Sequence, residues 1–217
     1  IYDPVANTWS AAASTGQVRY AHTANRLQSG KVLIAAGGDF ATYFATAQIY
    51  DPVANTWAAA GAITGGARDS HTATLLPSGK VLLAGGSNGS SLNTVSIYDP
   101  ALNTWSAGPA MVGVRQVHGD VLLTTGKVLV VGGFGAAATV GTTEIYDPAA
   151  NTWAAGPALI GARYGHGTTL LPSAKVLAAG GALGAAVLNT AEIFSVNNAN
   201  GVACAQAGEC QSGFCVD

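Results

Sequence analysis

The sequence has 217 residues, of which 49% are hydrophobic and only 9% are charged, far below the roughly 25% of a typical globular protein. The formal net charge is −2, which excludes the basic surface of a nucleic-acid-binding protein and a polybasic membrane patch. No apolar run in the sequence reaches the roughly 18 residues that a membrane span needs. Low charge combined with 29 glycines favours an extracellular or cell-surface protein.

A nine-residue phrase opens the chain and returns at a constant interval. "IYDPVANTW" occupies residues 1–9, and near-identical copies start at Ile49, Ile97 and Ile145. A decayed copy, "IFSV", starts at Ile193, so every start lies 48 residues after the previous one. A period of 20–50 residues indicates a solenoid, a propeller or an array. Because the chain starts inside this phrase and without methionine, we expect at least one further unit before residue 1.

Three other motifs recur in a fixed order between the copies of this phrase. They are an Arg-x-x-His pair, a Lys-Val-Leu run and a Gly-Gly doublet. The Arg-x-x-His pairs are Arg19/His22, Arg68/His71, Arg115/His118 and Arg163/His166. The runs begin at Lys31, Lys80, Lys127 and Lys175, and the doublets are residues 37–38, 85–86, 132–133 and 180–181.

Each unit is predicted to form four short antiparallel strands. Residues 71–86 predict two strands joined by a hairpin turn at 77–80, since the second strand is continuously apolar and the turn contains Pro, Ser and Gly. Residues 93–100 predict a third strand, rich in β-branched and aromatic residues, and residues 103–108 a fourth. No segment has a sustained helical period with caps, so we expect almost no helix. Four strands per unit of 40–50 residues is the pattern of a propeller blade.

The ordered set Arg-x-x-His, Gly-Gly, Tyr-Asp-Pro and Asn-Thr-Trp resembles the kelch repeat over about residues 1–194. The resemblance implies an all-β fold, a kelch-type β-propeller segment of four repeats. The predicted domain covers residues 1–196, with opening strands at 1–12. The blades are expected at about 13–60, 61–108, 109–156 and 157–196.

Two arrangements of the blades remain open. Kelch propellers usually have six or seven blades, and Ile1–Asp3 is a spare strand, so we favour an arc of a larger ring. The alternative is a closed four-bladed ring in which the strand at Trp9 completes the last blade. An arc has open blade edges, through which the chain would self-associate.

The repeated charged and aromatic residues are interpreted as structural. All four histidines occupy the same position of the repeat, so we expect neither a metal site nor a cofactor. The tryptophans Trp9, Trp57, Trp105 and Trp153 are predicted core residues. A buried arginine paired with a carboxylate of a Tyr-Asp-Pro turn is a further hypothesis.

Candidate binding residues lie where the repeat is broken. The loop at residues 39–46 carries Asp39, Phe40, Tyr43 and Phe44, while the corresponding loops of the other units are far less aromatic. Aromatic rings with a carboxylate on a loop suit sugar stacking or a peptide hot spot; the alternative is a loop that packs on its own blade. Asp69, Gln116 and Asp120 also depart from the repeat, and we expect them to face the axial channel.

The leading functional hypothesis is a non-catalytic binding or display scaffold whose ligand is a protein or a glycan. The alternative is a fragment of a carbohydrate-active kelch enzyme, an oxidase or a lyase, completed by missing blades or another domain; a structural spacer is the third hypothesis. Galactose-oxidase-like enzymes use a Tyr–Cys cofactor with copper. The propeller region contains no cysteine, so that cofactor has no candidate residue in it.

The composition changes in residues 197–217. All three cysteines, Cys204, Cys210 and Cys215, lie in this tail, which resembles the short Cys-rich segments of bacterial surface proteins. The pattern predicts a small disulfide module of an exported protein. A zinc site and a reduced, unstructured tail are the competing interpretations.

Overall fold

The computed structural model describes residues 1–195, which contain strands and no helix. Accordingly, this part of the chain has no helical segment of the length and hydropathy that would cross a bilayer. The three cysteines and the predicted disulfide module lie outside the described residues.

Three four-stranded antiparallel sheets and one three-stranded sheet follow one another along the chain. The first sheet contains β3 (Thr23–Arg26), β4 (Val32–Ala35), β5 (Thr46–Asp51) and β6 (Thr56–Ala62). The second contains β7 (Thr72–Leu75), β8 (Val81–Ala84), β9 (Val95–Asp99) and β10 (Thr104–Gly108). The third contains β11 (Gly119–Leu122), β12 (Val128–Val131), β13 (Thr143–Asp147) and β14 (Thr152–Ala155). The fourth contains β15 (Gly167–Leu170), β16 (Lys175–Ala179) and β19 (Ala191–Ser195).

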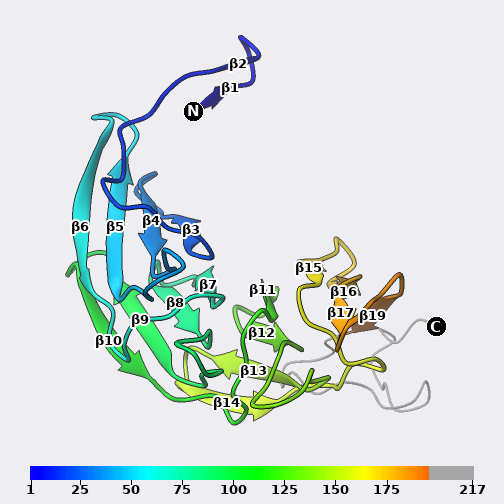
Figure 1. Cartoon of the computed structure of the whole chain (residues 1–217). Helices are drawn as coiled ribbons and strands as arrows, with labels where there is room; N and C mark the ends of the chain where they lie inside the picture. Colours follow the sequence, from blue (N-terminus) through cyan, green and yellow to red (C-terminus); the bar gives the residue numbers. More distant parts are fainter. Residues whose placement is uncertain (196–217) are drawn as a thin grey trace.

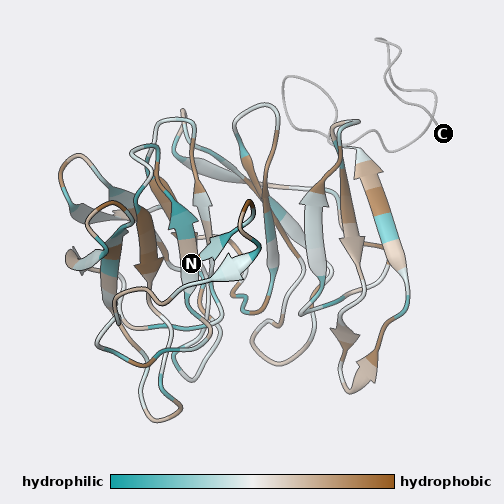
Figure 2. Cartoon of the chain, turned by 90° about the horizontal axis from the view of Figure 1, so that it is seen from above, coloured by the Kyte–Doolittle hydropathy of each residue, from teal (hydrophilic) through white to brown (hydrophobic). Residues whose placement is uncertain are grey.

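These sheets are blades 1 to 4 of a propeller arc (Figure 1), and the prediction of an all-β propeller segment is confirmed for the described residues. The first strand of each blade lies on the inner side of the arc, and the fourth strand of blades 1 to 3 on the outer side. The first-to-second and third-to-fourth strand turns gather at one end of the blades. The loops between second and third strands gather at the other end, where β17 (Ala182–Leu183) and β18 (Ala186–Val187) form a small hairpin (Figure 2).

The hydrophobic core consists of layers between neighbouring blades. Every side chain of β8 and β12 is buried, because the second strands of blades 2 and 3 are covered on both faces by the adjacent blades. Tyr98 of blade 2 is fully buried against blade 1, together with Trp105 at 8% exposure. The indole Nε1 of Trp105 donates a hydrogen bond of 2.8 Å to the backbone oxygen of Ala60 in blade 1. The repeated aromatic pair therefore attaches each blade to the previous one.

The repeated phrase encodes a turn with its own internal hydrogen bonds. In blade 2 the Tyr98 hydroxyl donates to Asn103 Oδ1 at 2.7 Å, and Asn103 has a φ of 53°, a conformation that asparagine tolerates better than most residues. Asp99 accepts the backbone N–H of Ala101 at 3.0 Å and forms a 3.0 Å ion pair with Lys80. The phrase is thus conserved between blades because it closes one hairpin and anchors it to the preceding turn.

A chain of backbone hydrogen bonds links the blades along their inner rim. It connects the residue before each histidine: Ser70 N donates to Ala21 O at 3.1 Å, Val117 N to Ser70 O at 2.9 Å, and Gly165 N to Val117 O at 2.9 Å. All four residues have a positive φ, 48° at Ala21 and 50° at Val117. Positive φ is unfavourable for a β-branched residue such as Val117, so the blade-to-blade bonding holds this rim in a fixed shape.

The arc is open in this structure. The strands β1 (Tyr2–Asp3) and β2 (Thr8–Trp9) pair only with each other, and β19 has no fourth strand beside it among residues 1–195. The closed four-bladed arrangement, in which the strand at Trp9 completes the last blade, is therefore not the one adopted (Figure 1). Trp9 is 80% exposed, which corrects the prediction that all four tryptophans are core residues: within the described chain no blade packs against its hairpin.

We expect Trp9→Ala to change the free energy of unfolding by less than about 0.5 kcal/mol, as for most exposed positions. The matched variant Trp105→Ala removes the buried residue at the same place in the repeat and is the destabilising control. Urea denaturation followed by far-UV circular dichroism measures both. Equal losses in the two variants would show that Trp9 is packed in solution.

Candidate functional site

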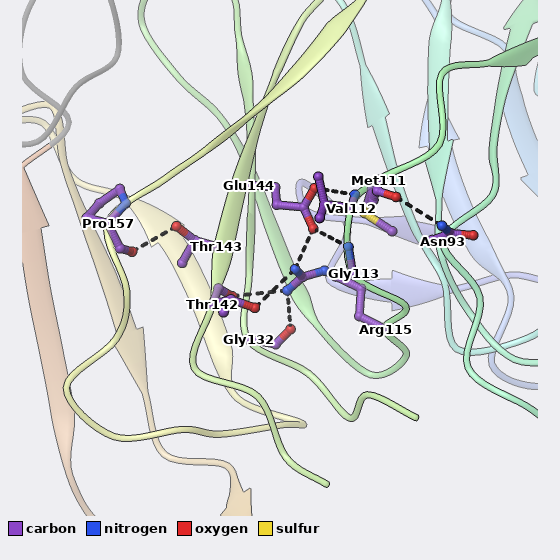
Figure 3. A network of polar contacts seen from close by, with 10 residues as sticks. All are labelled: Asn93, Met111, Val112, Gly113, Arg115, Gly132, Thr142, Thr143, Glu144 and Pro157. Atoms are coloured by element: carbon purple, nitrogen blue, oxygen red, sulfur yellow. Dashed lines mark hydrogen bonds and ion pairs between the residues drawn. The ribbon is translucent and has the colours of Figure 1, made fainter. Parts of the chain in front are cut away.

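The arginine of each Arg-x-x-His motif holds its own blade together. Arg115 is 1% exposed, and its Nη1 donates to the carbonyls of Gly132 and Thr142 at 2.8 and 3.0 Å. Its Nη2 forms a 2.7 Å ion pair with Glu144 of β13, which also accepts the backbone N–H groups of Val112 and Gly113 (Figure 3). This geometry joins the loop before Arg115 to the second and third strands of blade 3.

The carboxylate partner differs from the one expected. The turn aspartates Asp51, Asp99 and Asp147 pair with lysines at 3.0–3.1 Å, whereas Arg115 and Arg163 pair with Glu144 and Glu192, which precede the turn. The hypothesis of an arginine–turn aspartate pair is therefore wrong. Each turn aspartate lies near the surface, where the lysine of its own blade reaches it, whereas Arg115 and Arg163 are buried in the interior of their blades.

In blade 2 the repeat arginine, Arg68, has no carboxylate partner. Ser96 occupies the position of Glu144, and Arg68 donates its Nη2 to the backbone oxygen of Gly65 at 3.0 Å instead. Burial alone lowers the pKa of Arg68 to about 10. The chain has one extra residue before Arg68 relative to Arg115, which brings the Gly65 carbonyl to the guanidinium.

The histidines pack between blades. His71 and His118 are 6% and 7% exposed, and their Nε2 atoms lie 2.9 and 3.0 Å from the hydroxyls of Thr23 and Thr72 in the preceding blades. Burial, reinforced by Arg68, lowers the pKa of His71 to about 3, so this imidazole is neutral in the folded protein. At His166 the corresponding threonine is replaced by Gly119, and neither ring nitrogen has a hydrogen-bond partner within the described chain.

The residue that follows each arginine pairs with the start of the loop between the second and third strands of its own blade. Each of these four residues forms an isolated bridge: Tyr20 with Gly38, Asp69 with Ser87, Gln116 with Phe134, and Tyr164 with Ala182. In blades 2 to 4 the partner directly follows the glycine pair. The adjacent inner-rim hydrogen bonds fix the backbone at these positions. The repeat therefore presents one variable side chain per blade beside one variable loop.

The glycine pair of blade 1 is shifted relative to the predicted register. Gly37 N donates to Arg68 O as Gly86 N donates to Arg115 O, so Ala36–Gly37 corresponds to Gly85–Gly86. Gly38 consequently takes the position of Ser87. A Cβ at residue 38 would lie 2.7 Å from the backbone oxygen of Thr42, so glycine is required for this loop to fold back closely.

The loop of blade 1 forms a tight turn that exposes an aromatic ring. Asp39 Oδ1 accepts the backbone N–H groups of Ala41 and Thr42 at 3.1 and 2.8 Å. These bonds, with that of Thr42 first, lower the pKa of Asp39. Phe40 has a φ of 71° and is 89% exposed. Its ring stacks on Tyr20, with centroids 4.2 Å apart and planes within 10°.

Five residues therefore meet at the loop end of blades 1 and 2, and we call them the Tyr20 site: Tyr20, Asp39, Phe40, Tyr43 and Asp69. Gly38 forms isolated antiparallel β-bridges with both Tyr20 and Tyr43. The pKa of Tyr20 is raised, first by burial and then by the negative charge and hydrogen bond of Asp69, with smaller contributions from Tyr43 and Asp39. Asp69 is only 7% exposed. The Tyr20 site thus combines aromatic side chains with two carboxylates at the loop end of blades 1 and 2.

The remaining predicted residues lie elsewhere. Phe44 is partly buried below Arg19, whose guanidinium carbon is 5.6 Å from its ring centroid. Gln116 Nε2 donates to Ser91 Oγ at 3.1 Å and belongs to the blade 2–blade 3 edge. Asp120 does not face an open channel: its Oδ2 accepts the Thr74 hydroxyl between blades, and burial raises its pKa.

Sequence reasoning missed Tyr20. Its counterpart in blade 4 is Tyr164, so tyrosine at this position looks like part of the repeat, whereas Asp69 and Gln116 are recognisable departures from it. Within residues 1–195, no three His, Cys, Asp or Glu side chains come together as metal ligands.

A family model described as the Kelch motif matches residues 70–112 and 121–159. This match, together with the repeated sheets, supports a kelch-type β-propeller fold for the described residues. The two matched ranges fall on blades 2 and 3, and blades 1 and 4 repeat the same strand order, the fourth strand of blade 4 excepted. Kelch repeats commonly mediate protein binding. No curated protein matched this chain.

Proposed function

We propose that this kelch segment is a non-catalytic binding scaffold and that the Tyr20 site binds a protein ligand, an exposed loop or a peptide segment. Support comes from the position of the site: it combines the variable side chains of two blades with the one loop that carries an exposed aromatic ring. Exposed aromatic side chains on a fixed backbone are the usual anchors of protein interfaces.

The observation that carries the proposal is the conformation of Phe40. A bulky residue at positive φ is a backbone outlier, and such strain is typical of functional sites. Here the strain positions a ring that is 89% exposed, an arrangement that contributes little to the stability of the folded chain. Stacking on Tyr20 restricts the ring to one orientation, which lowers the entropy lost when a ligand packs on its free face.

Panning a random peptide library displayed on phage against the immobilised chain tests this proposal. We expect enriched peptides to bind Phe40→Ala at least about tenfold more weakly, a loss of about 1.4 kcal/mol of binding free energy. Val112→Ala is the control, because Val112 is also exposed, at 85%, but lies in the loop that precedes Arg115.

Peptides that bind both variants as well as they bind the wild type would overturn the proposal. Binding of an oligosaccharide on a glycan array, abolished by Phe40→Ala while no peptide is enriched, would replace the protein ligand by a glycan. Thermal melting of each variant ensures that a loss of binding does not reflect unfolding.

We also propose that the protein acts outside the cell or at its surface. The low charged fraction of 9% and the confinement of all three cysteines to residues 204–215 support this location. Exposure of intact source cells to a protease, followed by detection with an antibody to this segment, tests it: degradation without lysis supports the proposal, and full protection contradicts it.

A further inference from the structure

We infer that the Tyr20 site selects a cationic side chain of its ligand, and specifically the guanidinium of an arginine. This inference rests on the proposed function and specifies the chemistry of the bound segment. It is carried by the distribution of charge along the blades together with the arrangement of the aromatic rings.

The first step is the use that the fold makes of its cations. Lys31, Lys80 and Lys127 pair with turn aspartates. The repeat arginines donate to backbone carbonyls within their blades: Arg19 to Ala36, Arg68 to Gly85, Arg115 to Gly132 and Arg163 to Gly180. The remaining cations, Arg26 and Lys175, lie at the end of β3 and the start of β16. Both positions adjoin the first-to-second strand turns, at the end of the blades away from the Tyr20 site.

The second step is that the carboxylates of the Tyr20 site have no cationic partner. No lysine, arginine or histidine nitrogen lies within 4.0 Å of Asp39 or Asp69 among the described residues. Asp69 does not neutralise its sequence neighbour Arg68 either, because the Nη atoms of that arginine donate to the backbone oxygens of Gly65, Gly85 and Thr94. Asp69 is nine-tenths buried, and the bonds from Ser70 N to Ala21 O and from Gly37 N to Arg68 O hold its backbone beside blade 1 next to Tyr20. A charge in this position favours a cation from outside the chain.

The third step is the geometry of the rings. Tyr20 and Phe40 are stacked, so one face of Phe40 is covered and the opposite face is open. A cation over an aromatic face is attracted by the ring quadrupole. Guanidinium is planar, so it stacks on a ring while its N–H groups bond a carboxylate at the edge of that plane, which an ammonium group does less well. The combination of a flat exposed ring with carboxylates that lack a cationic partner in the same site therefore favours arginine over lysine.

The decisive measurement uses small probes, so that it does not depend on finding the natural ligand. Two-dimensional NMR of the 15N-labelled chain follows titration with N-acetyl-L-arginine methylamide, and a parallel titration uses the citrulline analogue, which has the same shape without the charge. We expect the arginine probe to shift the amides of residues 20, 38–43 and 69, and the citrulline probe to bind at least about tenfold more weakly. The lysine analogue is expected to bind with intermediate affinity.

Two variants separate charge from packing. Asp69→Asn removes the charge and retains the shape, and we expect a three- to tenfold loss of affinity for the arginine probe with no loss for citrulline. Asp39→Asn retains the oxygen that caps the loop and is expected to act in the same direction. Gln116→Ala, in the next blade, is the control and should leave both titrations unchanged.

Equal binding of arginine and citrulline, or amide shifts confined to other parts of the chain, would overturn the inference. Peptides from the panning experiment distinguish this failure from failure of the proposed function. Phe40-dependent peptides without arginine would leave the protein-binding site standing and remove the guanidinium preference, whereas an absence of Phe40-dependent peptides would remove the site itself.

Discussion

Arg115→Ala is expected to lower the free energy of unfolding by about 3–5 kcal/mol, the usual cost of removing one partner of a buried ion pair. The variant leaves Glu144, a carboxylate at 4% exposure, without its cation, and leaves the carbonyls of Gly132 and Thr142 without their donor. Urea denaturation at pH 7 measures the loss.

Blade 2 provides the matched control. Arg68→Ala removes the same side chain from the same position, but no carboxylate is left behind because Ser96 replaces the glutamate. We therefore expect a smaller loss than in Arg115→Ala. The double variant Arg115→Ala/Glu144→Ala should be more stable than Arg115→Ala, since the buried charge is gone. Equal losses for Arg115→Ala and Arg68→Ala would contradict this account.

The second large effect is a loss of stability in mild acid. The pKa of His71 is lowered to about 3 in the folded protein, against about 6.5 in the unfolded chain. Below pH 6.5 the unfolded state therefore binds more protons than the folded state, and stability falls as the pH falls toward 3. At pH 5 the cost from His71 alone is about 2 kcal/mol.

The other three histidines act in the same direction. Burial lowers the pKa of His166 to about 4 and that of His118 well below its ordinary value, and burial together with Arg19 lowers the pKa of His22. Asp120 opposes them, since its raised pKa favours the folded state as it becomes protonated, and Glu192, with a lowered pKa, adds to the loss only near and below pH 4.5.

Urea denaturation at pH 7, 6 and 5 tests this prediction. His71→Asn removes one titrating group from the blade 1–blade 2 layer, so the decrease in stability between pH 7 and 5 should be smaller by about 2 kcal/mol than in the wild type. An identical pH dependence in both proteins would show that His71 is accessible to protons in the folded state.

The repeat itself made the fold predictable. A 48-residue period with Lys-Val-Leu and Tyr-Asp-Pro in fixed order indicates which segments are second and third strands. Identical units of this kind bury their faces only against one another. The open arc and the exposure of Trp9 could not be predicted with the same certainty, because packing depends on which blade is the neighbour and not on the sequence of the hairpin.

The candidate site was predictable in part. Asp39, Phe40, Tyr43 and Asp69 depart from the repeat, and the structure brings them together. Their common centre, Tyr20, is distant from the loop in sequence and meets it only through the bridge at Gly38. Asp120 also departs from the repeat, but it lies within β11, where side chains alternate between the two faces of the sheet, and its carboxylate accepts the Thr74 hydroxyl of the preceding blade. A shift of one residue along the strand would place it on the opposite face.

The position of the lysines has a practical consequence. All four lysines of the sequence begin or immediately precede a second strand, so every side-chain amine lies at the turn end of the blades. Reagents that couple lysine amines to a sensor surface or a bead will attach the protein by this end. The Tyr20 site is then directed away from the support, so amine-immobilised protein retains an accessible binding edge without an engineered tag.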